Sequence, residues 1–135
     1  MKTETQLVVE LLRLGTFLTR TGNRLMAGHG LSQQQFVILK TIEERGPISQ
    51  LQIRNQLLYE RSNVSKATSY LVSLGFVETT KSTEDKRVTF LAITSEGKQT
   101  ITACMNIFNK WNKSWSNQLG AKERRQLVRL LRKVK

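Results

Sequence analysis

Two nearly identical helix starts constrain the fold of this chain more than any other feature of its sequence. In "LSQQQF", Ser32 can accept a hydrogen bond from the backbone N–H of Gln35, whose side chain can bond back to Ser32. In "ISQLQI", Ser49 and Gln52 repeat this capping box, and apolar residues flank both pairs as hydrophobic staples. The intervening "RGP" ends the first helix. The sequence therefore predicts two short helices in close succession, the second over about Gln50–Leu57.

A third short helix is predicted in "ERSNVSKATSYLVSLGF", with Ser62 as its N-cap and Gly75 ending it. One face of this helix carries small apolar groups at i, i+3, i+4 and i+7, namely Val64, Ala67, Thr68 and Leu71. The opposite face carries short hydrogen-bonding side chains. We therefore expect one buried face and one exposed polar face.

The period then changes to two, which predicts a β-hairpin of the strands "FVETT" and "RVTFLAI" around the polar tip "KSTED". Two strands alone are marginally stable, so the hairpin must pack against the helices. Thr94 is predicted to cap a long helix that continues to Trp115. Amphipathic helices are also predicted over about Thr5–Met26 and over Ala121–Val134, the latter after a break at Gly120. The fold class is mainly α with a small β-hairpin.

Charge indicates the chemistry of the partner. The chain has 22 basic and 10 acidic residues, a net charge of +12, which favours nucleic acid or an anionic membrane surface. Residues 99–135 hold nine of the basic residues and only one acidic residue. Charge alone would point to the C-terminal helix. Its leucines, however, must also be covered, and packing against a second copy of the chain covers them better than a membrane does.

Catalysis is disfavoured. Cys104 is the only cysteine and His29 the only histidine, so neither an internal disulfide nor a Cys/His metal cluster can form within one chain. His29 lies in the loop-like "AGHGLS", and no acid/base pair or phosphate-binding loop is present. We therefore expect no catalytic residue, no metal and no cofactor. No signal peptide or membrane span is evident, so the expected compartment is the cytoplasm.

Two apolar features on the long helix are open to a second interpretation. Trp111 and Trp115 lie at i and i+4, which favours packing over a ligand site. Cys104 lies in the same apolar stripe as Ile101 and Phe108, which favours a buried structural thiol over a redox sensor.

Three helices followed by a hairpin is the element order of a winged helix-turn-helix, and its chemistry suits DNA. The third helix offers short polar side chains to the major groove, and the hairpin tip offers an arginine to the minor groove. An acidic residue two positions before that arginine can hold its guanidinium. The candidate DNA-binding residues are Arg61, Ser62, Asn63, Ser65, Lys66, Ser69, Lys86 and Arg87, with Asp85 as the salt-bridge partner of Arg87. The plainer alternatives are a solvated helix face, a surface arginine and a turn-forming Asp.

The segments "LSQQQFVILKTI", "RSNVSKATSYLVSLGFVE" and "DKRVTFLAIT" resemble, in order and spacing, the MarR family of bacterial transcriptional regulators. "DKR" followed by "FLAITSEGK" is similar to the wing signature of that family. The resemblance implies one domain over 1–135, with a winged-helix DNA-binding part at about 31–95 and dimerisation helices at about 1–30 and 96–135. By position, Arg87 resembles the wing arginine of the family and Asp85 its ion-pair partner.

The resemblance further implies a homodimer that binds double-stranded DNA at a pseudo-palindromic operator, as a repressor or activator, often under the control of a small-molecule ligand. Three departures stand out: "LQIRNQLLYE" lacks a small Ala common in the family, Thr79 stands where a basic residue is common, and Ile93 replaces a Leu. The alternative function is a winged-helix module that binds proteins without reading DNA. Such a module would bind insensitively to salt and to changes at Lys66 and Arg87.

Overall fold

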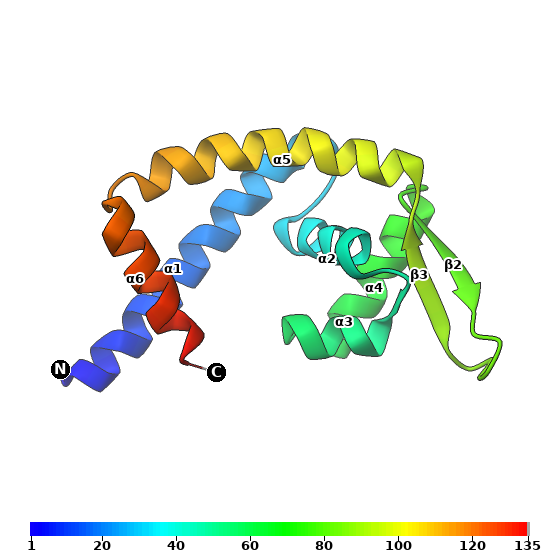
Figure 1. Cartoon of the computed structure of the whole chain (residues 1–135), viewed down its shortest axis with the longest axis horizontal. Coiled ribbons are helices and arrows are strands. Elements are labelled where there is room, and N and C mark those ends of the chain that lie inside the picture. The colour runs from blue at the N-terminus through cyan, green and yellow to red at the C-terminus, as the bar shows by residue number, and fades with distance from the viewer. Residues whose placement is uncertain (135) are drawn as a thin grey trace. The chain divides into compact units, whose positions relative to one another are not determined.

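The structure of the protein is a computed structural model that describes residues 1–134. These residues form two compact units that divide between Cys104 and Met105. In the first unit, the chain runs through α1 (Thr3–Met26), η1 (Ala27–His29), α2 (Gln33–Arg45), β1 (Ile48–Ser49), α3 (Gln50–Leu57), α4 (Arg61–Ser73), β2 (Val77–Lys81) and β3 (Thr89–Ile93) (Figure 1). Helix α5 (Ser95–Ser116) begins in this unit, and the second unit contains its end and α6 (Ala121–Arg132).

Both predicted capping boxes are confirmed. The backbone N–H of Gln35 donates to Ser32 Oγ at 3.1 Å, and Ser32 N–H donates to Gln35 Oε1 at 2.9 Å. The corresponding distances for Ser49 and Gln52 are 3.2 Å and 2.9 Å. Each box satisfies two backbone N–H groups at a helix start, which explains why α2 and α3 begin where the sequence predicts.

Helix α4 has the expected two faces, but its predicted start is wrong. Its inner side chains are buried: Val64, Ala67, Thr68 and Leu71. The N-cap is Glu60 rather than Ser62, and Glu60 makes no side-chain cap hydrogen bond. The chain turns through a left-handed conformation at Leu58, with φ of 59°, and is extended at Glu60, so Arg61 already has helical geometry. Ser62 therefore lies inside the first turn, with an exposed side chain.

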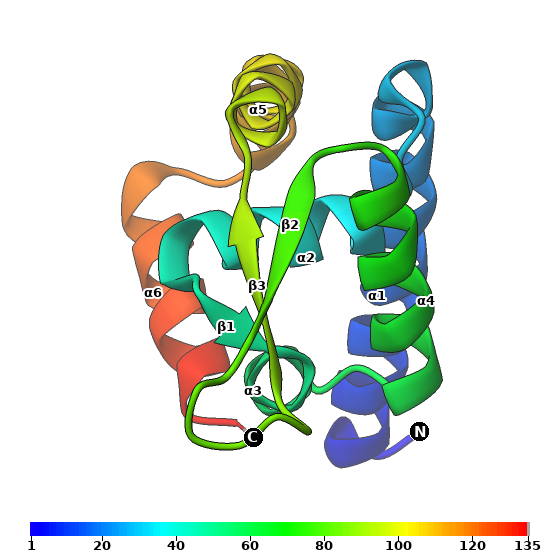
Figure 2. The same cartoon turned by 90° about the vertical axis from the view of Figure 1, so that its right-hand side faces the viewer.

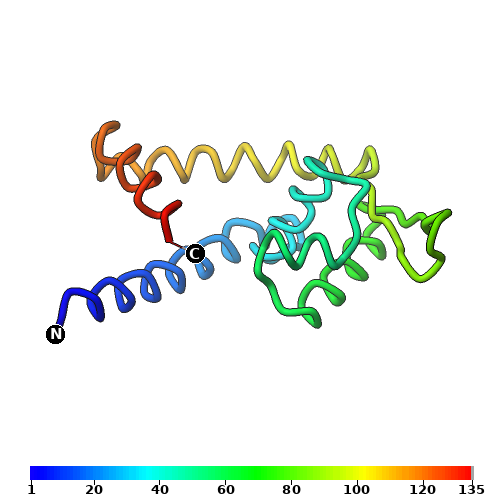
Figure 3. Tube along the Cα trace, turned by 60° about the horizontal axis from the view of Figure 1, so that its bottom comes forward, coloured from blue at the N-terminus to red at the C-terminus, as the bar shows by residue number. Residues whose placement is uncertain are grey.

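The sheet has three antiparallel strands in the order β1-β3-β2, one more than the sequence predicts (Figure 2). Strand β1 pairs Ile48 with Leu91, which ties the start of α3 to the base of the hairpin. Because β2 extends to Lys81 and β3 begins only at Thr89, the tip covers 82–88, and the predicted strand start at Arg87 is wrong. The tip extends away from α2, α3 and α4 (Figure 3).

Two residues join the hairpin to its neighbouring helices. Gly75 ends α4 with a φ of 81°, a left-handed conformation that glycine adopts without strain. Thr94 Oγ1 donates to the Gly75 carbonyl at 2.7 Å and accepts from Gly97 N–H at 3.0 Å, which confirms Thr94 as the cap of α5. The terminal helices are confirmed with shifted ends, since α1 begins at Thr3 and α6 ends at Arg132.

The two features of α5 that the sequence left open have clear surroundings. Cys104 is fully buried, and this burial raises the pKa of its thiol, which disfavours the reactive thiolate. Trp111 and Trp115 stack with ring centroids 5.4 Å apart and planes inclined by 10°. Both observations favour packing roles. Over residues 1–134, no helix is long and apolar enough to cross a membrane.

Candidate nucleic-acid interface

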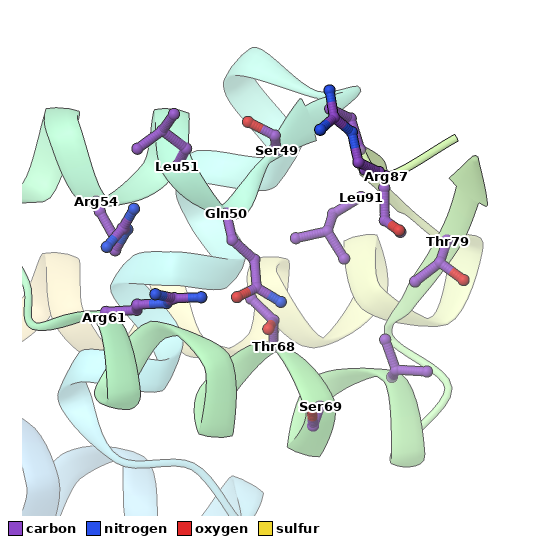
Figure 4. Close-up of a pocket in the computed structure, with 13 residues that line it drawn as sticks. Ser49, Gln50, Leu51, Arg54, Arg61, Thr68, Ser69, Thr79, Arg87 and Leu91 are labelled. Carbon is purple, nitrogen blue, oxygen red and sulfur yellow. The ribbon is translucent and has the colours of Figure 1, made fainter. Parts of the chain in front are cut away.

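A hollow of about 580 Å³ opens between α3, α4 and the hairpin (Figure 4). Strand β1 places the first turn of α3 beside β3, and the connection through Gly75 places α4 beside β2. The hollow is therefore built by the same contacts that hold the hairpin to the helices. Its lining residues are Ser49, Gln50, Leu51, Arg54, Arg61, Thr68, Ser69, Val72, Thr79, Arg87, Val88, Thr89 and Leu91.

The hollow is strongly cationic. Arg54, Arg61 and Arg87 line it, and no acidic residue does. Figure 4 shows Arg54 and Arg61 toward one end of the hollow and Arg87 at the other. Guanidinium groups form paired hydrogen bonds with phosphate and with the edges of guanine, and hydroxyl and amide side chains between them can complete such contacts. The chemistry of the hollow thus suits an elongated polyanion.

The hairpin tip is shaped by its own side chains. Ser82 Oγ accepts from the backbone N–H groups of Glu84 and Asp85, both at 3.2 Å. Val88 N–H donates to the Asp85 carbonyl at 2.9 Å, which closes a four-residue turn from Asp85 to Val88. Asp85 Oδ1 also accepts from the backbone N–H of Arg87 at 3.0 Å, the pattern of an Asx-turn. Asp85 therefore forms the turn.

Asp85 also holds the side chain of Arg87. Arg87 Nε donates to Oδ1 and Nη2 donates to Oδ2, both at 3.1 Å, so the carboxylate and guanidinium meet as two parallel forks. These hydrogen bonds from the Arg87 side chain and backbone lower the pKa of Asp85. The Arg87 side chain is nevertheless 90% exposed. The two residues therefore meet within the turn at the hairpin tip.

The candidate residues of α4 fall into three rows. Ser62, Lys66 and Ser69 lie at i, i+4 and i+7 on the outer face, while Arg61 flanks them on one side and Asn63 on the other. All are exposed, as is Ser65. Within residues 1–134, the side chains of Ser62, Asn63, Lys66 and Ser69 form no hydrogen bond or ion pair, so their polar groups are available to a partner.

Only part of the predicted set lines the hollow. Arg61, Ser69 and Arg87 are brought together there by α4 and the hairpin tip. The other candidates lie on the surface outside the lining: Ser62, Asn63, Ser65, Lys66, Asp85 and Lys86.

Sequence reasoning missed the contribution of α3. Gln50, Leu51 and Arg54 line the hollow from this helix, and Thr79 lines it from β2. A signal for α3 was present: with Ile53 buried, Leu51 falls on the opposite side of the helix and is 56% exposed. Large apolar residues on an otherwise polar helix face often mark a binding surface.

A helix with an exposed polar face, a preceding helix packed across it and an antiparallel hairpin beside it define a winged helix-turn-helix fold. The MarR family model matches residues 31–89, which run from the start of α2 through α4 into β3. Over these residues the chain therefore matches the MarR family, as the hairpin motif indicated.

Individual proteins agree with this assignment. The transcriptional regulator PapX of Escherichia coli is 26% identical over 78% of this chain and 66% of PapX, so the chain spans slightly less than two thirds of this relative. The transcriptional regulator BldR of Sulfolobus solfataricus has the same fold, with a TM-score of 0.89, 20% identity and coverage of 99% of this chain and 97% of BldR. BpsR of Bordetella bronchiseptica, whose DNA binding is regulated by 6-hydroxynicotinic acid, gives a TM-score of 0.87 at 19% identity over 98% of this chain and 95% of BpsR.

Proposed function

We propose that this chain is a sequence-specific, double-stranded DNA-binding regulator of transcription. The observation that carries the proposal is the cationic hollow between α3, α4 and the hairpin, beside which α4 presents exposed polar side chains. Phosphate contacts from exposed basic side chains would give most of the affinity, because neutralising phosphates releases counterions. Arg54 and Arg61, which line the hollow, would contact the DNA only when α4 lies in the major groove, so they would favour the operator over other sequences. Side chains of α4 would read the major groove, and Arg87, aimed by Asp85, would enter the minor groove.

The regulator is proposed to act as a homodimer on a pseudo-palindromic operator. Helix α1 exposes a row of large apolar side chains in the single chain, among them Leu7, Val8 and Leu12, each more than half exposed. Helix α6 independently exposes Leu127 and Leu131. Apolar faces of this size favour association, and two-fold symmetry would place two recognition helices in successive major grooves about one helical turn apart.

Repression and release by a small-molecule effector complete the proposal. The regulation of BpsR by 6-hydroxynicotinic acid supports ligand control for this fold. A repressor in the cytoplasm would block transcription by occupying its operator and would leave it when the ligand favours a conformation with lower DNA affinity.

The alternative is a winged helix that binds another protein. Exposed Leu51 at the hollow and Leu58, which is 85% exposed next to α4, are the observations that favour it. This alternative predicts little dependence on salt, because its contacts would be mainly apolar.

Selection of binding sites from a random duplex pool tests the proposed function. We expect an inverted-repeat consensus whose binding weakens steeply with salt and is weaker by about 1–3 kcal/mol in Arg87→Ala. Enrichment of no consensus, together with Arg87→Ala and wild type binding alike, would contradict sequence reading. Repression is then tested on the selected site placed at a promoter: a reporter that falls supports it, and a reporter that rises identifies an activator.

A further inference from the structure

Helix α6 carries a continuous cationic face, here called the α6 stripe. Its members are the exposed side chains Lys122, Arg125, Arg129, Arg132 and Lys133. Positions 125, 129 and 132 are related by i, i+4 and i+7, so their guanidinium groups follow one side of the helix. The stripe extends about 16 Å along the helix axis at 1.5 Å per residue.

The other charged groups of this region are already engaged. Arg124 Nη1 donates to the Leu119 carbonyl at 2.7 Å and to the Ser116 carbonyl at 3.3 Å, which satisfies carbonyls at the last residue of α5 and just beyond it. Glu123, the only acidic residue of α6, accepts from Gly120 N–H at 2.8 Å. In the part of the chain that the structure describes, no carboxylate forms an ion pair with the stripe.

We propose that the α6 stripe is a second DNA-binding surface, which binds the phosphate backbone of duplex DNA without reading its sequence. Two shallow hollows, of about 430 and 300 Å³, lie along α6, and both are lined by Arg125 and Arg129. Side chains that leave such spaces between them can receive successive phosphates. The inference goes beyond the proposed function, which assigns sequence reading to the winged helix alone.

The shape of the stripe selects a linear polyanion over a compact one. A free phosphate or pyrophosphate would contact one pair of arginines and leave the rest of the stripe unused. Duplex DNA carries one charge per about 1.7 Å of its axis, so it can neutralise cations along the whole stripe. The charge of the stripe, without short hydrogen-bonding side chains among it, suits attraction and not base reading.

A membrane surface has the same sign of charge and is the competing partner. Binding flat to a membrane would require the apolar face of α6, where Leu127, Leu130 and Leu131 are each 44–45% exposed. The same face is the one that dimerisation would cover, and covering it leaves only the stripe outward. DNA needs the stripe alone, which favours DNA.

The test uses the full chain with Arg125→Gln and Arg129→Gln together, because Gln keeps helix propensity while removing two charges. The matched control is Lys110→Gln with Lys113→Gln, which removes two exposed charges from the end of α5 in the same compact unit. The affinity for a duplex of scrambled sequence is measured over a range of salt concentrations. We expect the slope of log affinity against log salt to decrease in magnitude by about 2 in the stripe variant and by less than 1 in the control.

Equal slopes for the stripe variant and the control would overturn the proposal. So would loss of binding to phosphatidylglycerol vesicles by the stripe variant with unchanged binding to the scrambled duplex, which would identify a membrane surface. The preference for an operator over the scrambled duplex is expected to stay within about twofold of wild type, because the stripe weakens both complexes alike. A wild-type chain that binds the operator and the scrambled duplex equally well would contradict the proposed function. The change in salt slope of the stripe variant would still support the α6 stripe as a DNA-binding surface.

Discussion

Helices α4 and α6 are almost equal in length, 13 and 12 residues, and both present a polar face, yet they are built in opposite ways. The apolar face of α4 is buried in its own chain, whereas α6 has no buried residue. The outer face of α4 holds mostly hydroxyl and amide groups, and that of α6 holds five cations. The weakly charged helix is the anchored one, and the strongly charged helix is the exposed one.

This difference separates attraction from recognition. Sequence reading requires side chains held in fixed positions, which the packing of α4 and the Asp85–Arg87 pair provide. Charge on a long side chain attracts any phosphate and needs little positioning. The net charge of +12 therefore favours a polyanionic partner, but the most basic segment is not the one that we expect to read the sequence.

The largest expected effect tests the anchoring of α4. Leu71→Ala should lower the free energy of unfolding by about 2–5 kcal/mol, because Leu71 is fully buried and its removal leaves a cavity. Val72→Ala, one position along the same helix and 38% exposed, should change it by less than about 1 kcal/mol. Denaturant titration measures both, and equal effects would show that α4 is not held by its inner face.

The next effect compares the hairpin tip, which carries Arg87, with α6. Arg87→Ala should weaken binding to the selected operator by about 1–3 kcal/mol and binding to a scrambled duplex by less, so the preference falls. Arg125→Ala on α6 should weaken both by similar factors and leave the preference unchanged. Competition binding at fixed salt gives the two ratios. A preference that depends on Arg125 and not on Arg87 would reverse the assignment of the two regions.

A single hydrogen bond tests how the C-terminal end of α4 is held. Tyr70 Oη donates to the Gly30 carbonyl at 2.7 Å, which joins α4 to the segment before α2. Tyr70→Phe should lower the free energy of unfolding by about 0.5–1.5 kcal/mol, since it removes the hydroxyl and leaves the ring. Ser73→Ala removes a hydroxyl that bonds only within α4 and is the matched control. A smaller effect for Tyr70→Phe than for Ser73→Ala would contradict a joining role.

The smallest effect concerns the aim of Arg87. Asp85→Asn should reduce the operator preference while it strengthens binding to a scrambled duplex, because the arginine is freed and a negative charge is removed. Since the pKa of Asp85 is lowered, the carboxylate stays charged at pH values where an ordinary Asp becomes protonated. The ion pair is lost only as pH falls through the lowered pKa. NMR titration of the Asp85 carboxyl should show this low pKa in wild type and a higher one in Arg87→Ala, where only the backbone hydrogen bond to Asp85 remains.

Local signals in the sequence predicted most of the fold. The capping boxes at Ser32 and Ser49 involve residues three apart, so their hydrogen bonds follow from short-range sequence alone, and both are present. The start of α4 was predicted two residues late because the deciding feature is the left-handed backbone at Leu58, a conformation that leucine rarely adopts. Strand β1 was missed since two residues carry no periodicity, and only its pairing with β3 defines it.

The sequence predicted the part of the candidate site that depends on short-range spacing and missed the part that depends on packing between distant segments. Ser69 and Arg61 could be placed on the outer side of α4 by helical spacing, and Asp85 and Arg87 lie close enough in sequence to predict their contact. The contribution of Arg54 depends on how α3 packs beside the hairpin, through the pairing of β1 with β3. Contacts of that kind join distant parts of the chain, and no short-range pattern reports them.

The most direct test of the account is the operator preference of a chain in which two of the three arginines that line the hollow are replaced by neutral residues. Arg54→Gln with Arg61→Gln removes two of the three arginines that line it and leaves Arg87 and the α6 stripe intact. The ratio of affinities for the selected operator and a scrambled duplex is measured beside that of Arg125→Gln with Arg129→Gln. The account predicts that this ratio falls at least about tenfold in the hollow variant, which corresponds to about 1.4 kcal/mol, and stays unchanged in the stripe variant. A hollow variant that keeps its preference while the stripe variant loses it would contradict the account.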